Sequence, residues 1–269
     1  MKAYDFEYDN LSLSSFGYTL CNFGSKGLQT ISNGSMITFN TVSTLNGAKH
    51  ELTSVEYENC LETVLQICKN PCGTDDFEMT IDELRILSRW LNRKGFYKLK
   101  FLDEEYIDLY YEASIVSIGR IELNGKLCGL ELNIVTNSPF PRKEPRIINI
   151  NNTVVNGKHS INDTSHEEGY IYPYTEITIG DIGDGEKTLV ITNAIENRKT
   201  VIENCVSNEV ITMDYPVITS TLQSHNIQND FNWNFFRVAN TYENSRNDLT
   251  ISLPCSIKIK YSPIVKVGL

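Results

Sequence analysis

The segment from Arg85 to Ala113 holds the side chains that most directly suggest chemistry. Its first part is basic, and Arg85, Arg89 and Arg93 recur every four residues, a spacing that places side chains on one face of a helix. Such a stripe could bind phosphate groups. However, the net charge of the chain is −10, neither half is basic, and nearby acids can supply partners. We therefore expect a solvated or inter-subunit face and not a nucleic-acid site.

The second part of this segment is acidic and could in principle supply a pair of catalytic carboxylates. Glycoside hydrolysis needs two carboxylates across a cleft, in environments that push their pKa values apart. Side chains clustered on one hairpin have no such asymmetry, so we expect a hydrophilic turn and an exposed strand face. The acidic residues are Asp103, Glu104, Glu105, Asp108 and Glu112.

No other motif points to an enzyme. The sequence has no Walker A motif, dinucleotide fingerprint or Gly-x-Ser-x-Gly nucleophile elbow, so no catalytic or cofactor-binding residue is predicted. The segment IGDIGDGEK lacks the ordered oxygen ligands of a calcium loop. The histidines are far apart in the sequence and predict no metal site; they are His50, His159, His166 and His225.

The seven cysteines are odd in number and scattered, which does not indicate a disulfide framework. Cys68 and Cys72 are the nearest pair. Their spacing is neither that of a redox pair nor half of a standard zinc site. We expect most of the cysteines to be small, buried hydrophobic side chains.

The segment FNWNFF, which begins at Phe231, could form an aromatic platform for sugar stacking. In a strand, alternation would place Phe231, Trp233 and Phe235 on one face and the two asparagines on the other. An aromatic row with a period of two is typical of a sandwich core, and this is the preferred interpretation. Trp233 is nevertheless the candidate for a saccharide contact.

One helix is predicted, over about residues 80–94. Thr80 is a suitable N-cap, and Glu83, three residues later, completes a capping box. Gly95 stands where a C-terminal cap is expected, and Trp90 is assigned to the core. The buried stripe is expected to consist of Ile81, Leu84, Leu87 and Leu91.

After this helix the hydrophobic period changes to two, which predicts a hairpin. A short connection at Asp103–Glu105 would pair Leu99 with Leu109 and Lys100 with Asp108, so that register and charge agree. Two further hairpins are predicted where an Asn-Gly dipeptide separates alternating runs, because both residues tolerate positive φ. These dipeptides are Asn46-Gly47 and Asn124-Gly125.

The polar segment NSPFPRKEPR, residues 137–146, contains three prolines and is the best candidate for a domain boundary. We therefore expect one domain over residues 1–138 and a second over 139–269. Strand signals dominate both, which predicts a mainly β fold with two antiparallel β-sandwich domains, the first also containing one helix and the hairpins. No signal peptide or membrane span is visible, so synthesis in the cytoplasm is expected.

Several segments, taken in order, resemble the distal tail proteins (Dit) of long-tailed phages of Gram-positive bacteria. They extend over both domains, and the elements RWLNRK and YSPIVKVG are the most telling. The segments are TFNTVSTLNGAK, LQICKNPC, LSRWLNRKGFYKLKF, DLYYEAS, GLELNIVTNSPF, NEVITMD, SHNIQNDFNWNFFRVANTYEN and ISLPCSIKIKYSPIVKVG.

This resemblance implies a structural role without catalysis. Members of the family form a six-fold ring at the tail tip, around the channel through which DNA passes. The ring joins the last tail-tube ring to the tail-associated protein and to the host-adhesion apparatus with its receptor-binding protein. We therefore expect a homohexameric hub in the virion tail tip, with DNA only as passing cargo, no membrane association and no cofactor. The resemblance also implies a galectin-like second domain.

A binding function is an alternative to this structural role. The second domain could be a carbohydrate-binding module that recognises a host cell-wall saccharide. Trp233 and the polar loops His159–His166 and Gly180–Glu186 are then the first places to examine. A galectin-like shape alone does not establish such a function.

Overall fold

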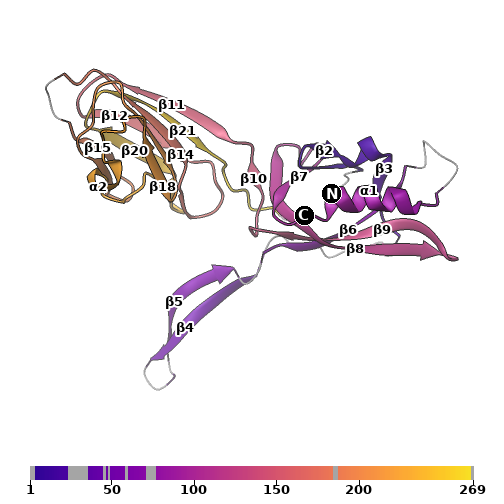
Figure 1. Ribbon diagram of the computed structural model, residues 1–269. Coiled ribbons are helices and arrows are strands. Elements are labelled where there is room, and N and C mark those ends of the chain that lie inside the picture. Colours follow the sequence, from indigo (N-terminus) through magenta and orange to yellow (C-terminus); the bar gives the residue numbers. More distant parts are fainter. Residues whose placement is uncertain are drawn as a thin grey trace. The chain divides into compact units, whose positions relative to one another are not determined.

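The computed structural model describes residues 4–23, 36–44, 47, 49–57, 60–70, 77–183 and 187–267. The chain forms two compact units (Figure 1): unit 1 comprises Met1–Lys143 with Val265–Leu269, and unit 2 comprises Glu144–Ile264. The division falls inside the proline-rich segment, and the last residues join unit 1 instead of the second domain. No helix within the described ranges is long and apolar enough to cross a membrane.

Unit 1 is built on one antiparallel sheet of eight strands. The strands are β1 (Phe6–Tyr8), β2 (Leu11–Ser12), β3 (Tyr18–Cys21), β6 (Glu62–Lys69), β7 (Tyr97–Phe101), β8 (Leu109–Leu123), β9 (Lys126–Thr136) and β10 (Arg142–Lys143). Their order is β2-β1-β7-β8-β9-β6-β3, and β10 pairs with β8. A short 3-10 helix, η1 (Leu13–Phe16), connects β2 to β3.

The main helix, α1 (Ile81–Leu91), begins with a complete capping box. The Thr80 hydroxyl accepts a hydrogen bond from the Glu83 N–H, and the Glu83 carboxylate accepts one from the Thr80 N–H at 2.7 Å. Lys69 adds an ion pair to the same carboxylate at 3.1 Å. Burial opposes ionisation of Glu83, but the Thr80 and Lys69 contacts outweigh it and lower the pKa of this carboxyl.

The predicted end of this helix at Gly95 is wrong. Asn92 has already left the helical conformation, with φ of −89° and ψ of 84°, and its N–H closes the last turn on Ser88. Gly95 lies in the following turn at a φ of 122°, where glycine is favoured. At the other end, Ile81 is 56% exposed and does not belong to the buried stripe.

Trp90 connects α1 to the first strands of the sheet. Its ring is stacked on Phe16, with 4.4 Å between ring centroids, and lies nearly parallel to Phe6. The indole N–H donates a hydrogen bond to the Tyr8 carbonyl at 3.1 Å. The other buried residues of α1 are Leu87 and Leu91.

The predicted register of β7 and β8 is off by two residues. Leu99 pairs with Tyr111, because the connection between the strands contains two successive turns and is longer than expected. Lys100 pairs with Glu7 of β1 and not with an acid of β8. A shift of two residues keeps each side chain on its predicted face of the sheet.

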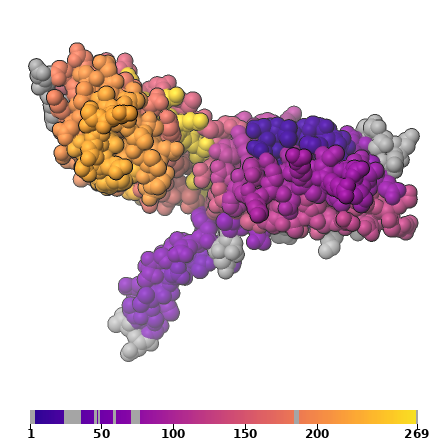
Figure 2. All heavy atoms as spheres, in the orientation of Figure 1, coloured from indigo at the N-terminus to yellow at the C-terminus, as the bar shows by residue number. Residues whose placement is uncertain are grey.

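The predicted turn at Asn124-Gly125 joins β8 to β9, and both residues have positive φ, 52° and 78°. The other predicted hairpin consists of β4 (Ile37–Thr44) and β5 (Lys49–Tyr57), which form a separate two-stranded sheet. Figure 2 shows the side chains of these two strands at the molecular surface. Asn46 of its turn lies outside the described residues.

Unit 2 is a sandwich of two antiparallel sheets. The first consists of β11 (Arg146–Asn152), β14 (Tyr174–Ile179), β17 (Val210–Asp214), β18 (Val217–Ser220) and β21 (Cys255–Tyr261). The second consists of β12 (Gly157–Asn162), β15 (Leu189–Asn193), β16 (Arg198–Ile202) and β20 (Arg246–Ile251). Their orders are β11-β21-β14-β17-β18 and β12-β20-β15-β16. The remaining elements are β13 (Gly169–Ile171), β19 (Val238–Asn240) and α2 (Ile227–Asp230).

The core of unit 2 lies between these two sheets. Along β21, buried and exposed residues alternate without exception, as expected for a strand with one face in the core. Inward-facing residues from both sheets form one cluster, which includes Ile177, Ile191, Ile211, Ile251, Ile257 and Ile259. The predicted fold class, mainly β with antiparallel sheets and one main helix, is confirmed.

Removal of the helix cap is predicted to destabilise unit 1. Thr80→Ala should lower the free energy of unfolding by about 1 kcal/mol, whereas Thr80→Ser keeps the hydroxyl acceptor and should cost less. The two tryptophans of the chain lie one in each unit. In a Trp233→Phe background, urea unfolding followed by Trp90 fluorescence therefore reports on unit 1. Equal urea midpoints for the Ala and Ser variants would contradict a capping role.

The cap also predicts a pH dependence. Because the pKa of Glu83 is lowered in the folded chain, its stabilising contribution is present above the ordinary value of 4.5 and is lost as the pH falls through the folded-state pKa. The difference in urea midpoint between the parent protein and Glu83→Gln should therefore shrink between about pH 6 and about pH 3. A difference that grows on acidification would contradict this assignment.

Candidate functional site

Arg93 belongs to the framework of unit 1 and not to a phosphate-binding stripe. Its guanidinium forms an ion pair with Asp9 at 2.9 Å. It also lies over the ring of Tyr97, 3.9 Å from the centroid, and near the ring of Tyr8 at 5.3 Å. Cation–π contacts of this kind are favourable when the cation is partly removed from water. Arg93 therefore fastens the end of α1 to β1 and β7.

The other two arginines of the predicted stripe are exposed. Arg85 forms an ion pair with Asp82 at 3.2 Å, in which both side chains are mostly solvent-accessible, and such pairs add little stability. Arg89 lies on the exposed surface of α1. Nearby acids thus supply partners for Arg85 and Arg93.

The acidic residues that follow β7 shape a turn and a strand. The Asp103 carboxylate accepts a hydrogen bond from the Glu105 N–H at 3.1 Å, which stabilises the first turn of the connection. Glu112 bonds to the side-chain amide of Asn137 and lies opposite Lys98 in the β7–β8 ladder. These contacts give Asp103 and Glu112 structural roles in the turn and in the β7–β8 pair.

The four histidines are distributed over separate elements. His50 lies in β5 and His159 in β12, where its Nε2 is 3.1 Å from the Asn152 side-chain oxygen. His166 and His225 lie in loops of unit 2. Within the described ranges, no group of three His, Cys, Asp or Glu side chains could hold a metal ion.

Glu209 centres a buried polar cluster that the sequence did not indicate. Its side chain is fully buried, and one oxygen lies 2.5 Å from both the Ser220 hydroxyl and His225 Nδ1. The other oxygen accepts a hydrogen bond from the Val206 N–H at 3.0 Å. His225 Nε2 lies 3.3 Å from Asp230. Because a buried carboxylate is stable only when it has such partners, the cluster fastens β18 and α2 to the start of β17.

Trp233 is 56% exposed, whereas Phe231 and Phe235 are buried. The predicted alternation is wrong because the segment is not a strand. The Asn232 side chain accepts a hydrogen bond from the Val201 N–H, and Trp233 itself has a φ of 57°, which is uncommon for a residue other than glycine. The indole ring lies 5.8 Å from the ring of Phe231, and its exposed surface is accessible to a partner.

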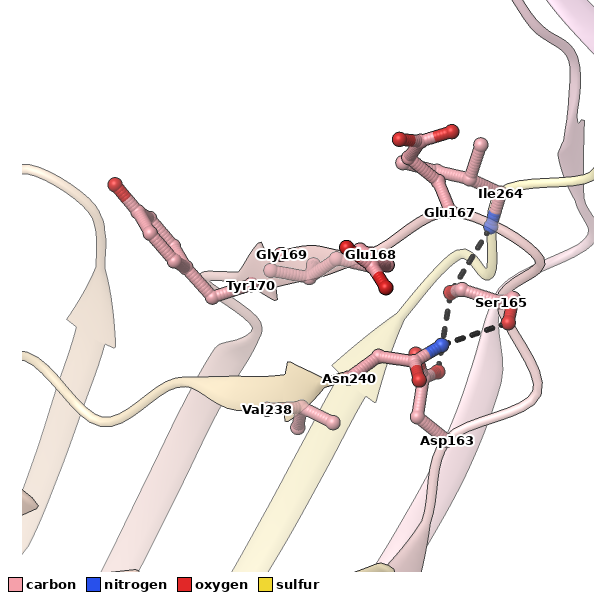
Figure 3. A pocket seen from close by; sticks show the side chains of 10 residues that line it. Asp163, Ser165, Glu167, Glu168, Gly169, Tyr170, Val238, Asn240 and Ile264 are labelled. Atoms are coloured by element: carbon pink, nitrogen blue, oxygen red, sulfur yellow. Dashed lines mark hydrogen bonds between the residues drawn. The ribbon is translucent and has the colours of Figure 1, made fainter. Parts of the chain in front are cut away.

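Asp163 and Ser165 of the polar loop after β12 help to line a pocket that is itself too small for a saccharide (Figure 3). The Ser165 hydroxyl donates to Asp163 at 3.1 Å and accepts from the Ile264 N–H, and the Ser165 carbonyl accepts from the Asn240 side chain at 2.7 Å. The volume of about 20 Å³ holds about one water molecule. Of the other polar loop examined for saccharide contacts, residues 184–186 lie outside the described residues.

Two protein families match consecutive parts of the chain. The family described as phage tail protein N-terminal domain matches residues 1–138, and the one described as phage tail C-terminal domain matches residues 140–261. The chain belongs to this phage tail protein family. No curated protein gives a significant match to its sequence.

A solved distal tail protein shares the fold of this phage tail protein. The Dit protein (gp 19.1) of phage SPP1 is described as a paradigm of the hub adsorption apparatus in phages that infect Gram-positive bacteria. It has a TM-score of 0.61 at 11% identity, over 97% of this chain and 99% of that chain. The baseplate of phage P2 in its activated conformation with Ca has a TM-score of 0.49 at 12% identity, over 97% and 98%. The chain thus belongs to a phage tail protein family and shares the fold of a distal tail protein, as the resemblance predicted.

The framework role of Arg93 predicts a difference between two arginines of the same helix. Arg93→Ala should lower the free energy of unfolding by about 1 to 2 kcal/mol, because it removes the contacts with two tyrosines and leaves Asp9 unpaired. Arg89→Ala should change it by less than about 0.5 kcal/mol. Urea denaturation measures both. Weakened binding to duplex DNA in Arg89→Ala, with unchanged stability in Arg93→Ala, would support the phosphate stripe instead.

The buried thiols are predicted to be unreactive. Burial raises the pKa of the Cys205 thiol to about 11 and that of Cys255 to about 12, whereas Cys60 is exposed. A short pulse of iodoacetamide at about pH 8, followed by peptide mass spectrometry, should alkylate Cys60 at least about tenfold faster than the other two. Prior unfolding in urea should abolish the difference. Cys72 lies outside the described residues.

Proposed function

We propose that this phage tail protein is the hub of a tail tip: a homohexameric ring that joins the last tail-tube ring to the tail-associated protein and the host-adhesion apparatus. Its family and the fold that it shares with SPP1 Dit support this role. The structural feature that carries the proposal is the β4–β5 hairpin, whose exposed apolar face requires a partner.

The hairpin has one apolar and one polar face. In its register, Phe39 lies opposite Val55, Ile37 opposite Tyr57, and Thr41 opposite Leu52, so these side chains share a face. The other face contains charged and hydroxyl residues, such as the ion pair Lys49–Glu51. On the apolar face, four large side chains are about half exposed: Ile37 at 45%, Phe39 at 62%, Leu52 at 55% and Val55 at 50%.

An isolated two-stranded hairpin is at best marginally stable in water. The contact of Tyr57 with Phe140, at 5.3 Å between ring centroids, holds the base of this hairpin to the rest of unit 1. Farther along the two strands, the apolar face is covered by no other element of the described chain. A contiguous exposed apolar surface of this kind marks a site of protein association.

A second copy of this chain offers a complementary surface. In the large sheet of unit 1, Val64 of β6 and Val116 of β8 are 51% and 56% exposed, whereas Leu65 and Ile115 beside them face the core. A contact between the hairpin of one copy and this surface of the next uses two different patches. Such a heterologous contact generates a ring when the rotation between copies closes.

The acidic composition suits a channel through which DNA passes as cargo. The net charge of −10 means that a neutral or negative lumen is readily built, and like charge weakens contacts with phosphate. Specific DNA binding is therefore not part of the proposed function. The galectin-like character and the host-adhesion role implied for unit 2 belong to the same proposal, in which the exposed Trp233 offers a surface for a partner.

The proposal is tested by the mass of the purified protein in light scattering and native mass spectrometry. We expect six copies for the parent protein and a monomer for Phe39→Asp/Leu52→Asp, because two charges on the apolar face oppose its burial. The control is Val154→Asp/Tyr242→Asp, which adds the same charge at exposed positions of unit 2 and should still form the ring.

Circular dichroism establishes that both double variants are folded. A parent protein that is monomeric at every concentration, and is also absent from purified tails, would rule out the hub role. A hexamer that survives the hairpin substitutions would show that the ring forms through another surface.

A further inference from the structure

The outer face of the five-stranded sheet of unit 2 brings together polar side chains from three adjacent strands. In one row of the ladder, Lys258 of β21 lies between Asn149 of β11 and Glu176 of β14. In the next row, Lys260 lies beside Tyr174. Side chains in the same row of a sheet are about 5 Å apart, so these groups can contact one ligand together.

This face is hollowed in two adjoining places that share Lys258. The first hollow has a volume of about 320 Å³ and the second of about 390 Å³, both within the range of about 300–1,000 Å³ that is usual for ligand sites. Side chains in the first hollow include Asn149, Asn151, Glu176, Thr178 and Ser256. The second adds Ile147, Tyr174 and Lys260. Together they form one open groove along β11, β21 and β14, which we call the sheet groove.

The polar groups of the sheet groove have unused hydrogen-bonding capacity. The side chains of Asn149 and Thr178 make no hydrogen bond with any other described residue, and the side-chain oxygen of Asn151 accepts only a long bond of 3.5 Å from the Ser256 hydroxyl. A side-chain amide can donate two hydrogen bonds and accept two. These side chains can therefore bind a ligand that has many hydroxyl groups, without first breaking a strong internal bond.

The sheet groove is also locally basic on an acidic protein. Lys258 and Lys260 point from the same face of β21, and neither forms an ion pair within the described part of the chain. Glu176 is the acid beside Lys258, and it accepts a hydrogen bond from the Tyr174 hydroxyl at 3.3 Å. Two cations against one acid favour a ligand with negative charge.

We infer that the sheet groove binds an anionic saccharide. Lys258 and Lys260 pair with its phosphate or carboxylate groups, Asn149 and Thr178 bind ring hydroxyls, and the Tyr174 ring supports the apolar face of a sugar. The sequence did not indicate this site, because its strands come from opposite ends of unit 2.

Two other classes of ligand fit the sheet groove less well. A peptide partner usually inserts large apolar or aromatic anchors into pockets, whereas the lining here is mostly amide, hydroxyl and charged groups. Nucleic acid binding depends on many phosphate contacts, and two lysines on a chain with a net charge of −10 supply few. A saccharide with scattered charge matches both the hydrogen-bonding groups and the two lysines.

The inference does not depend on the proposed ring. The sheet groove lies wholly within unit 2 and is complete in a single chain, so saccharide binding and oligomeric state are measured separately. A protein that binds the saccharide, but is monomeric at every concentration and absent from purified tails, would refute the ring and support the groove. A hexamer that binds no saccharide would support the ring and refute saccharide binding in the sheet groove.

The test is a titration of the full-length protein with soluble polyglycerol phosphate, alginate, dextran, mannan and inorganic polyphosphate at matched ionic strength. We expect alginate, the anionic saccharide, to bind with a Kd between about 10 μM and about 1 mM. Polyglycerol phosphate, which has no sugar ring, and the neutral dextran and mannan should bind at least about tenfold more weakly. Lys258→Glu/Lys260→Glu should lose at least about tenfold in affinity, and Asn149→Ala/Thr178→Ala should lose affinity as well.

The matched control is Lys158→Glu/Lys199→Glu, which makes the same charge change at exposed positions of the other sheet of unit 2 and should bind like the parent protein. Absence of binding at about 1 mM saccharide, or equal losses in the groove and control variants, overturns the inference. So does binding of polyphosphate as tightly as the saccharides, because that result reflects charge alone. Tight binding of neutral polymers overturns the role assigned to the lysines.

Discussion

The indole of Trp90 fills the space between α1 and the first strands of unit 1, and its N–H satisfies the Tyr8 carbonyl in a place closed to water. Loss of this partner would leave a buried carbonyl unpaired, which is costly. The same tyrosine contacts Arg93 through its ring, so two residues of the helical segment hold one residue of β1. Because β1 pairs with β7 and β7 with β8, the position of α1 is coupled to the register of the central strands.

The β4–β5 hairpin shows the opposite situation, in which a local element is held to unit 1 at its base, by the contact of Tyr57 with Phe140. Its backbone hydrogen bonds are made within the pair, but side chains such as Phe39 and Leu52 remain about half exposed. Burial of apolar surface contributes about 25 cal/mol per Å², and this contribution becomes available only when a partner covers the hairpin. Within the described residues of unit 1, this hairpin therefore presents apolar side chains to solvent on one face.

The parts of the structure that were predictable from the sequence depend on near neighbours. Thr80 and Glu83 are three residues apart, and Asn124-Gly125 contains its own turn preference. The β7–β8 register was not predictable, because the turns of the connection and the pairing with β1 decide it together. Trp233 was assigned to the core because alternation assumes a strand, whereas a hydrogen bond from the distant Val201 N–H to Asn232 helps to hold the chain out of a regular strand. The sheet groove was not predictable either, because β11 and β21 are far apart in the sequence and only the fold brings them together.

This pairing of β11 with β21 also explains how unit 2 is accommodated in the chain. The chain leaves unit 1 after Lys143 and returns to it at Val265, so the two ends of unit 2 must come close together. The register meets this requirement, because Arg146, near the start of unit 2, lies directly opposite Tyr261, near its end. Return to unit 1 is then fixed by the hydrogen bond from the Val265 N–H to the Pro141 carbonyl. The strands that close unit 2 at its ends are the ones that line the sheet groove, so a ligand bound there would contact the strands that carry both connections to unit 1.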